Sequence, residues 1–182
     1  MAYSCAKTDS SFEIPEGVTK IDEMAFGQSR FNTLTLPDSY VISETVAVNI
    51  VNNKANSLAV AMYHYNNLQA VEVKPTNPYY ISLSGMVYSR DKTELWYVPP
   101  KITGTVTIEN GCTELMSGAC WMENNNYTGE LYTSIYIPKT VTKINDNTLN
   151  DLNRKTNNGF TINLDSENES FILQAGKIVK KQ

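Results

Sequence analysis

The chain has 182 residues, of which 41% are hydrophobic and 19% charged, which is enough apolar material for one sizeable core. Its 15 basic and 19 acidic residues leave a net charge of −4, which excludes the basic footprint of a nucleic-acid-binding protein. No stretch approaches the roughly 18 consecutive apolar residues of a membrane helix, and the mean hydropathy is −0.32, so we expect no membrane span.

Residues 1–11 are interpreted as an N-terminal linker. They lack the basic start, apolar run and small-residue cleavage site of a secretory signal peptide, so no signal peptide is expected in this chain. Cys5 lies in this polar segment. A lipid anchor at Cys5 is kept as an alternative, although the apolar run that precedes such cysteines is missing.

Short apolar–x–apolar triplets recur along the chain and predict strands, because alternate residues of a strand point to the same face. These triplets lie near residues 12–14, 34–36, 71–73, 105–108 and 134–137. The first copy, FEIPEGVTKI, recurs in register as IYIPKTVTKI at residues 135–144. Proline ends the ladder pairing and turns the chain off the sheet after each of these two strands. We therefore predict one stack of parallel rungs with a single buried column made of Ile14, Leu36, Val73, Ile108 and Ile137.

The segments between the rungs are less regular. Residues 45–51 alternate with period two and predict an extra strand, whereas residues 57–65 fit a short helix. The Asn/Asp-rich run at residues 145–151 lacks the glycine and glutamate of a calcium loop, so it is interpreted as a solvated turn. Residues 170–180 predict a hairpin that turns at Ala175–Gly176, within a C-terminal cap from about residue 160.

Two motifs in order suggest a family. Ile14 to Phe26 match the pattern LxxIxIPxxVxxIgxxAF, and Asn77-Pro78-Tyr79-Tyr80 leads into a predicted hairpin made of residues 85–88 and 95–100. The chain thereby resembles the BspA-like leucine-rich-repeat proteins, which are bacterial surface proteins that include adhesins. The resemblance implies a mainly β fold with short helical turns, a leucine-rich-repeat solenoid with an inserted β-hairpin unit. The resemblance covers about residues 12–150, and we expect a single domain over residues 12–182.

Catalytic groups are scarce. His64 is the sole histidine, and no motif supplies it with a nucleophile and an orienting acid. Cys112 and Cys120 occupy the positions of Val18 and Phe26 in the first copy, so we expect them to be buried and reduced. The sequence therefore predicts no enzyme, no metal site and no cofactor.

The middle residue of each triplet is expected to point outward. In the five predicted rungs these residues are Glu13, Thr35, Glu72, Thr107 and Tyr136. Such a ribbon is the usual recognition surface of a repeat array, although its role could equally be to solvate the sheet. Trp96, in the aromatic hairpin, is the alternative binding position.

From the resemblance and this ribbon we expect a non-catalytic binding module that is extracellular or on the cell surface. Adhesion or protein recognition is the expected role, with a host protein, a neighbouring-cell protein or a glycan as partner. A carbohydrate-binding accessory protein and a structural spacer within a larger surface protein are the alternatives.

Overall fold

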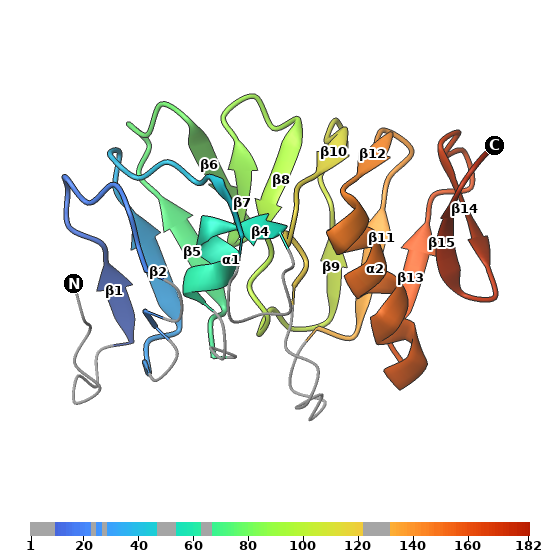
Figure 1. Cartoon of the computed structure of the whole chain (residues 1–182), viewed down its shortest axis with the longest axis horizontal. Helices are drawn as coiled ribbons and strands as arrows, with labels where there is room; N and C mark the ends of the chain where they lie inside the picture. Colours follow the sequence, from blue (N-terminus) through green and yellow to red (C-terminus); the bar gives the residue numbers. More distant parts are fainter. Residues whose placement is uncertain (1–9, 23–24, 27–28, 47–53, 63–66, 122–131) are drawn as a thin grey trace.

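The computed structural model describes residues 10–22, 25–26, 29–46, 54–62, 67–121 and 132–182. The protein is mainly β, and its strands form an elongated array that runs from β1 (Ser11–Glu13) at one end to the hairpin β14–β15 (Phe171–Gln174 and Lys177–Lys180) at the other (Figure 1). Strand β1 begins at the last residue of the predicted linker.

Six strands act as parallel rungs, in two separate sheets of three. The first sheet contains β1, β2 (Thr33–Leu36) and β5 (Ala70–Val73), and the second contains β9 (Thr105–Thr107), β11 (Ser134–Ile137) and β13 (Thr161–Leu164). The five predicted rungs are therefore present, but the prediction of one continuous stack is wrong because β5 and β9 belong to different sheets. Strand β13 is a sixth rung, and it lies in the segment predicted as the cap.

A β-meander separates the two sheets. It consists of β6 (Tyr80–Leu83), β7 (Met86–Ser89) and β8 (Glu94–Tyr97), and β8 continues the sheet through β10 (Glu114–Leu115) and β12 (Lys143–Ile144). The turn between β6 and β7 has positive φ at Ser84 (52°) and Gly85 (79°). A side chain at Gly85 would lie 3.1 Å from Ala70, so glycine lets the hairpin approach β5 closely.

The core is divided in the same way. Ile14 and Leu36 belong to one hydrophobic cluster, against which the half-buried Val73 packs, whereas Ile108 and Ile137 belong to a second cluster. The predicted column is thus inward-facing as expected, but it is interrupted at the meander.

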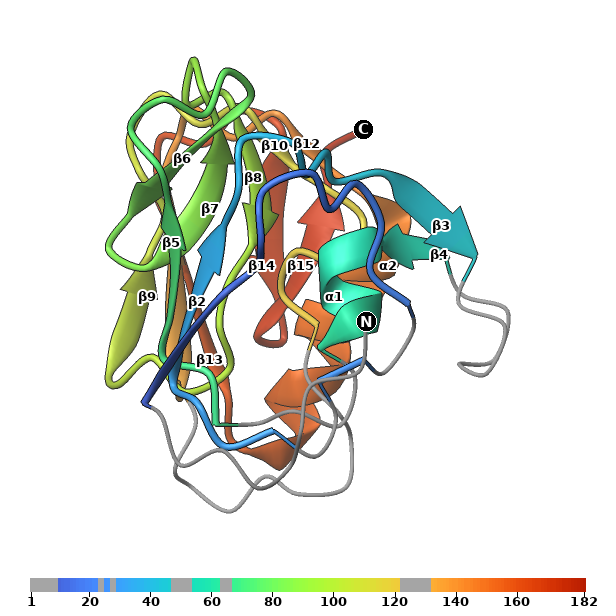
Figure 2. The same cartoon turned by 90° about the vertical axis from the view of Figure 1, so that its left-hand side faces the viewer.

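Two helices and a small hairpin lie on the side of the array opposite the rungs (Figure 2). These elements are β3 (Glu44–Val46), β4 (Lys54–Asn56), α1 (Ser57–Ala61), α2 (Asp146–Lys155) and the 3-10 turn η1 (Thr156–Asn158). The predicted extra strand begins within β3, and its remainder, residues 47–51, lies outside the described residues. The helix predicted over residues 57–65 is confirmed over Ser57–Ala61 as α1, and residues 63–65 lie outside the described residues.

The solvated turn predicted at residues 145–151 is wrong. Asn145 is the N-cap of α2, and its Oδ1 accepts a hydrogen bond from the amide of Asn147 at 3.1 Å. Asparagine is a favoured N-cap because its side chain satisfies an amide that has no partner within the helix. The Asn/Asp-rich composition therefore marked the start of a helix.

The two halves of the array repeat one design. We call residues 11–97 the N-terminal module and residues 105–181 the C-terminal module. Ile14 N donates to Thr35 O at 3.0 Å, and the equivalent Ile108 N donates to Tyr136 O at 3.1 Å. The tight turn Ala175–Gly176 has φ values of 49° and 77°, close to those of Ser84–Gly85. Hairpin β14–β15 is therefore the counterpart of hairpin β6–β7.

A buried asparagine fixes this hairpin in each module. Asn77 accepts from the amides of Tyr79 and Tyr80, both at 2.9 Å, and donates to Pro37 O at 3.0 Å. Its counterpart Asn168 accepts from the amides of the first hairpin residues and donates to Pro138 O at 3.1 Å. Each asparagine thus ties the third rung of its module to the turn that follows the second.

Candidate recognition surface

Three of the predicted outward residues form one row on the first sheet. Glu13 is paired in register with Thr35, and Thr35 with Glu72. Neighbouring rungs of a sheet lie about 4.8 Å apart, so the three side chains are direct neighbours. Glu13 and Glu72 are exposed and Thr35 is half-buried. The structure therefore brings these three residues together as predicted.

The negative charge of this first row is partly neutralised by a lysine of the same protein. Lys74 Nζ lies 2.7 Å from Glu13 Oε1 and 3.6 Å from Glu16 Oε2. The hydrogen bond with Glu13 raises the pKa of Lys74 above its ordinary value. The first row is therefore a salt-bridged surface and less acidic than its sequence suggests.

The second sheet carries its own row. Thr107 is paired with Tyr136, and Tyr136 with Asn163. Thr107 and Asn163 are exposed, while Tyr136 is half-buried. Asn163 was missed because residues 161–164 were assigned to the cap, although Ile162 and Leu164 around it show the same apolar–x–apolar alternation as the other rungs.

Tyr136 is held in place at its hydroxyl group. The hydroxyl donates to Asp165 Oδ2 at 2.8 Å. This hydrogen bond raises the pKa of Tyr136, and the amide of Glu167, followed by the Tyr136 hydroxyl, holds the pKa of Asp165 below its ordinary value. The ring is therefore fixed in one orientation at the centre of the second row.

The two rows do not form the single ribbon that was predicted. Glu72 lies on β5 and Thr107 on β9, and the β6–β8 meander stands between these strands (Figure 1). The expectation that all five residues are rung-to-rung neighbours is therefore wrong. The molecule instead presents a charged row, Glu13–Thr35–Glu72, and an uncharged row, Thr107–Tyr136–Asn163.

Trp96 has a packing role in the meander. Its side chain is half-buried, and its ring meets that of Tyr80 edge-on, with centroids 5.9 Å apart. The indole Nε1 donates to Glu94 Oε2 at 3.1 Å. The exposed aromatic of this region is Tyr79, with 49% of its surface accessible, which the sequence analysis did not single out as a site.

The two described thiols are buried as predicted. Burial raises the pKa of Cys112 to about 11 and that of Cys120 to about 12, so both are protonated at neutral pH and are poor nucleophiles. Cys5 and His64 lie outside the described residues. Within the described ranges, no helix has the length and apolar character needed to cross a membrane.

A buried lysine was not anticipated from the sequence. Lys155, at the end of α2, donates to the carbonyl oxygen of Cys120 and to the hydroxyl of Tyr132, the latter at 3.0 Å. Its Nζ also lies 5.0 Å from the ring centroid of Tyr132 and 5.4 Å from that of Phe160. Desolvation lowers its pKa to about 8. Its contacts are internal, and they close the side of the C-terminal module opposite the rungs.

Comparison with known proteins supports the fold. No protein-family model matches the chain, and no curated protein matches it in sequence. It is similar to the crystal structure of a leucine-rich repeat protein from Eubacterium ventriosum, with 20% identity and a TM-score of 0.50, over 85% of this chain and 41% of that chain. This likeness shows a leucine-rich-repeat-like fold.

A second solved structure is a weaker match. It is the pneumococcal vaccine antigen PcpA, with 17% identity and a TM-score of 0.43, over 74% of this chain and 35% of that chain. The chain therefore spans less than half the length of either solved neighbour.

Proposed function

We propose that the chain is a non-catalytic binding module of a cell-surface or secreted protein of the BspA-like type. In this proposal it recognises a protein partner through the uncharged row Thr107–Tyr136–Asn163. The observation that carries the proposal is the geometry of this row, in which three hydrogen-bonded rungs present the side chains in register with the tyrosine at the centre.

The row is already ordered before any partner binds. The Tyr136 ring is positioned by the Asp165 hydrogen bond, and its backbone is fixed by strands on both sides. Tyrosine has two side-chain torsions and offers both apolar area and a hydroxyl, so it contributes contact area at low entropic cost. A preorganised row of this kind loses little freedom on binding.

The polar surroundings of Tyr136 suit a protein partner. Thr105 and Thr161 are exposed on the same face of β9 and β13, and Thr105 Oγ1 lies 2.7 Å from Ser134 Oγ. The central tyrosine has hydroxyl and amide groups beside it in the row and the Asp165 carboxylate at its own hydroxyl. A central aromatic with polar neighbours matches the composition of protein-recognition surfaces. The charged row is less suited to binding a partner, because the carboxylate of Glu13 is already paired with Lys74.

The non-catalytic part of the proposal is supported by the state of the nucleophiles. Cys112 and Cys120 are protonated and enclosed, and Lys155, whose pKa is lowered to about 8, makes internal contacts. None of these groups reaches the outward face of the second sheet.

A binding screen tests the proposal. The purified chain would be screened against a panel of host matrix proteins and against a glycan array. For any protein found, Thr107→Lys and Tyr136→Lys should each weaken binding by tenfold or more, because each places a desolvated charge in the contact. Thr35→Lys is the matched control on the charged row and should bind as the wild type does.

Two outcomes would overturn this assignment. Full affinity of a Thr107→Lys/Tyr136→Lys double variant for a genuine protein partner would place the site elsewhere. Binding confined to the glycan array would favour the carbohydrate-binding alternative.

A further inference from the structure

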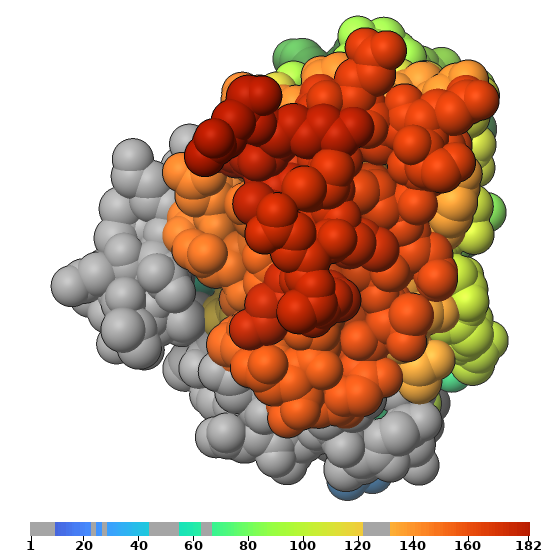
Figure 3. Space-filling view, turned by 90° about the vertical axis from the view of Figure 1, so that its right-hand side faces the viewer, coloured from blue at the N-terminus to red at the C-terminus, as the bar shows by residue number. Residues whose placement is uncertain are grey.

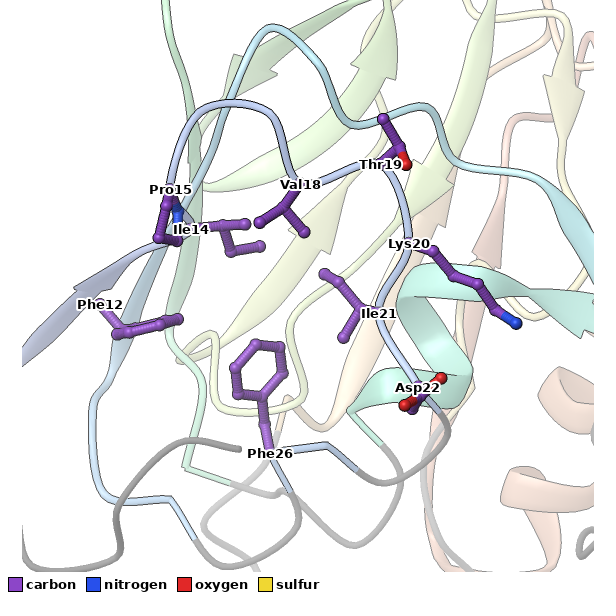
Figure 4. Close-up of a pocket in the computed structure, with 9 residues that line it drawn as sticks. All are labelled: Phe12, Ile14, Pro15, Val18, Thr19, Lys20, Ile21, Asp22 and Phe26. Atoms are coloured by element: carbon purple, nitrogen blue, oxygen red, sulfur yellow. The ribbon is translucent and has the colours of Figure 1, made fainter. Parts of the chain in front are cut away.

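The first coil of the array, Ser11–Phe26, encloses an open hollow. Phe12 and Ile14 point into it from the rung, and Val18, Ile21 and Phe26 point into it from the rest of the coil (Figure 4). The hollow has a volume of about 280 Å³, and all described residues that line it come from this coil. It lies at the N-terminal end of the array, where β1 is the outermost rung (Figure 1).

The same coil recurs inside the molecule, where its hollow is filled. Val106, Ile108, Cys112, Leu115 and Cys120 hold the equivalent positions in the first coil of the C-terminal module, and each is at most 1% exposed. In the N-terminal coil, by contrast, Phe12, Val18 and Ile21 remain half-buried.

The filling element inside the molecule is the β6–β8 meander. Met86 and Tyr88 on β7 and Leu95 on β8 belong to the same cluster as the C-terminal coil. The Tyr88 hydroxyl accepts a hydrogen bond from the amide of Glu109 at 3.2 Å, and β8 pairs with β10 in parallel. Within the molecule, therefore, this type of coil is completed by a hairpin from the preceding module.

The C-terminal end of the array presents the counterpart of that hairpin. In register, Ile172 and Val179 of hairpin β14–β15 correspond to Ile81 and Tyr88 of hairpin β6–β7. The hairpin lies across the end face (Figure 3), and Val179 is 37% exposed. Two of the four large hydrophobic side chains described as exposed, Leu173 and Val179, are on this hairpin.

The charges of the two ends are complementary. The hairpin and the residue after it carry Lys177, Lys180 and Lys181, of which Lys180 pairs with Asp146 at 3.0 Å, so two net positive charges remain. The described part of the N-terminal coil carries Glu13, Glu16 and Asp22 against Lys20. Lys74 pairs with Glu13 and Glu16, so one net negative charge remains at this end. Opposite charge around an apolar centre steers two surfaces into one orientation.

We propose that the C-terminal hairpin β14–β15 of one copy docks into the N-terminal hollow of a second copy. The contact repeats between molecules the junction that the meander makes within each molecule. It is a heterologous, head-to-tail contact, because different surfaces of the two copies meet, and it leaves a hollow and a hairpin free at the two ends of the dimer. The proposal concerns the ends of the array and is independent of the recognition row.

Sedimentation velocity on the full chain tests the proposal. The wild-type mass should rise with concentration from the micromolar to the millimolar range. Ile21→Glu changes the hollow and Val179→Glu changes the hairpin, and each variant alone should remain monomeric over the same range. Val41→Glu is the matched control, because Val41 is an exposed valine (46%) outside both surfaces and its variant should associate as the wild type does.

A mixture of the two variants gives the decisive result. Ile21→Glu keeps an intact hairpin and Val179→Glu keeps an intact hollow, so an equimolar mixture should form 1:1 dimers and no larger species. Lys177→Glu, a change at an exposed position that leaves the core untouched, should weaken association and reverse its response to salt.

The proposal is overturned by a monomeric wild type, by a mixture that fails to dimerise, or by equal loss of association in Val41→Glu and Val179→Glu. Deletion of residues 1–9 adds one further outcome. Association that appears after this deletion, from a wild type that is monomeric, would identify those residues as the occupant of the hollow and would likewise overturn the proposal.

Discussion

The N-terminal and C-terminal modules share their rungs, their tight turn and their buried asparagine, yet they differ in how their first coil is completed. Ile14 and Ile108 occupy equivalent positions, but Val18 and Ile21 remain half-buried whereas Cys112 and Leu115 are fully enclosed. The difference arises from the neighbour, because the meander covers the C-terminal coil. The comparison teaches that burial in a repeat array is set by what stacks on each coil as well as by the coil's own sequence.

The modules also differ on the side opposite the rungs. The short helix α1 buries Leu58, Ala59, Val60 and Ala61, all of which are uncharged. The longer helix α2 buries Thr148, Leu152 and Lys155 in the corresponding place. One module is therefore closed by an apolar turn, and the other by a helix that brings an amine into the core.

The largest expected effect compares an enclosed position with an open one. Ile137→Asp should lower the free energy of unfolding by about 4 kcal/mol or more, because it places a charge in a fully buried site. Ile21→Asp, in the half-buried hollow, should cost about 1–2 kcal/mol, because water can reach the new carboxylate. Urea denaturation of both variants measures the difference, and equal losses would refute the distinction between the two coils.

The next largest loss of stability is expected at the two buried asparagines, and it tests whether they are equivalent. Asn77→Ala and Asn168→Ala should each lower the free energy of unfolding by about 2–3 kcal/mol, because buried amides and carbonyls lose their partners. Asn168 donates to Val141 O as well as to Pro138 O, so its loss should be the larger. Chemical denaturation checks this, and a loss below about 0.5 kcal/mol at either site would show that its hairpin is held by other contacts.

A smaller effect is a pH dependence of the free energy of unfolding, which we expect from the buried Lys155 of α2. The pKa of Lys155 is lowered to about 8 by desolvation, against an ordinary value of 10.5, so the unfolded chain binds a proton that the folded protein releases. This group therefore makes the protein more stable as pH rises from about 8 to about 10.5. Between pH 7 and 9 the wild type should gain about 1 kcal/mol relative to Lys155→Met.

Urea unfolding of both proteins at each pH provides the measurement. The buried thiols act in the opposite direction, since their raised pKa values favour the folded state below about pH 9 and that contribution is lost at higher pH. Between pH 7 and 9 both thiols stay protonated in either folded protein, so their contributions cancel in the difference. Parallel pH profiles for the two proteins would contradict a buried, titrating Lys155.

The smallest effects concern the two outward rows. Tyr136→Phe removes the hydrogen bond to Asp165, and Glu13→Gln removes the charge that pairs with Lys74. Both groups face solvent, so each change should alter the free energy of unfolding by less than about 1 kcal/mol. Thermal denaturation tests this, and a larger loss in either variant would show that its row supports the fold instead of merely lying on it.

Much of the array could be predicted from residue patterns. The apolar–x–apolar triplets located five rungs and assigned Glu13 and Tyr136 to the outward face, because strand periodicity is a local property. The hairpin turn at Ala175–Gly176 was also predicted, and both residues have positive φ in the structure. Asn163 was missed even though its rung shows the same pattern, because the segment was assigned to a cap.

The sequence by itself determined which rung residues face inward, where the C-terminal hairpin turns and that both described thiols are core residues, since each depends on neighbours within a few positions. The tertiary structure alone decided that the sheet divides at the meander, because that division depends on which distant strands exchange hydrogen bonds. It also decided that Lys155 is buried against Tyr132 and that Asp165 holds Tyr136, since these contacts join residues 23 and 29 positions apart. Contacts of this range follow from the stacking of coils, which brings together side chains that no local pattern relates.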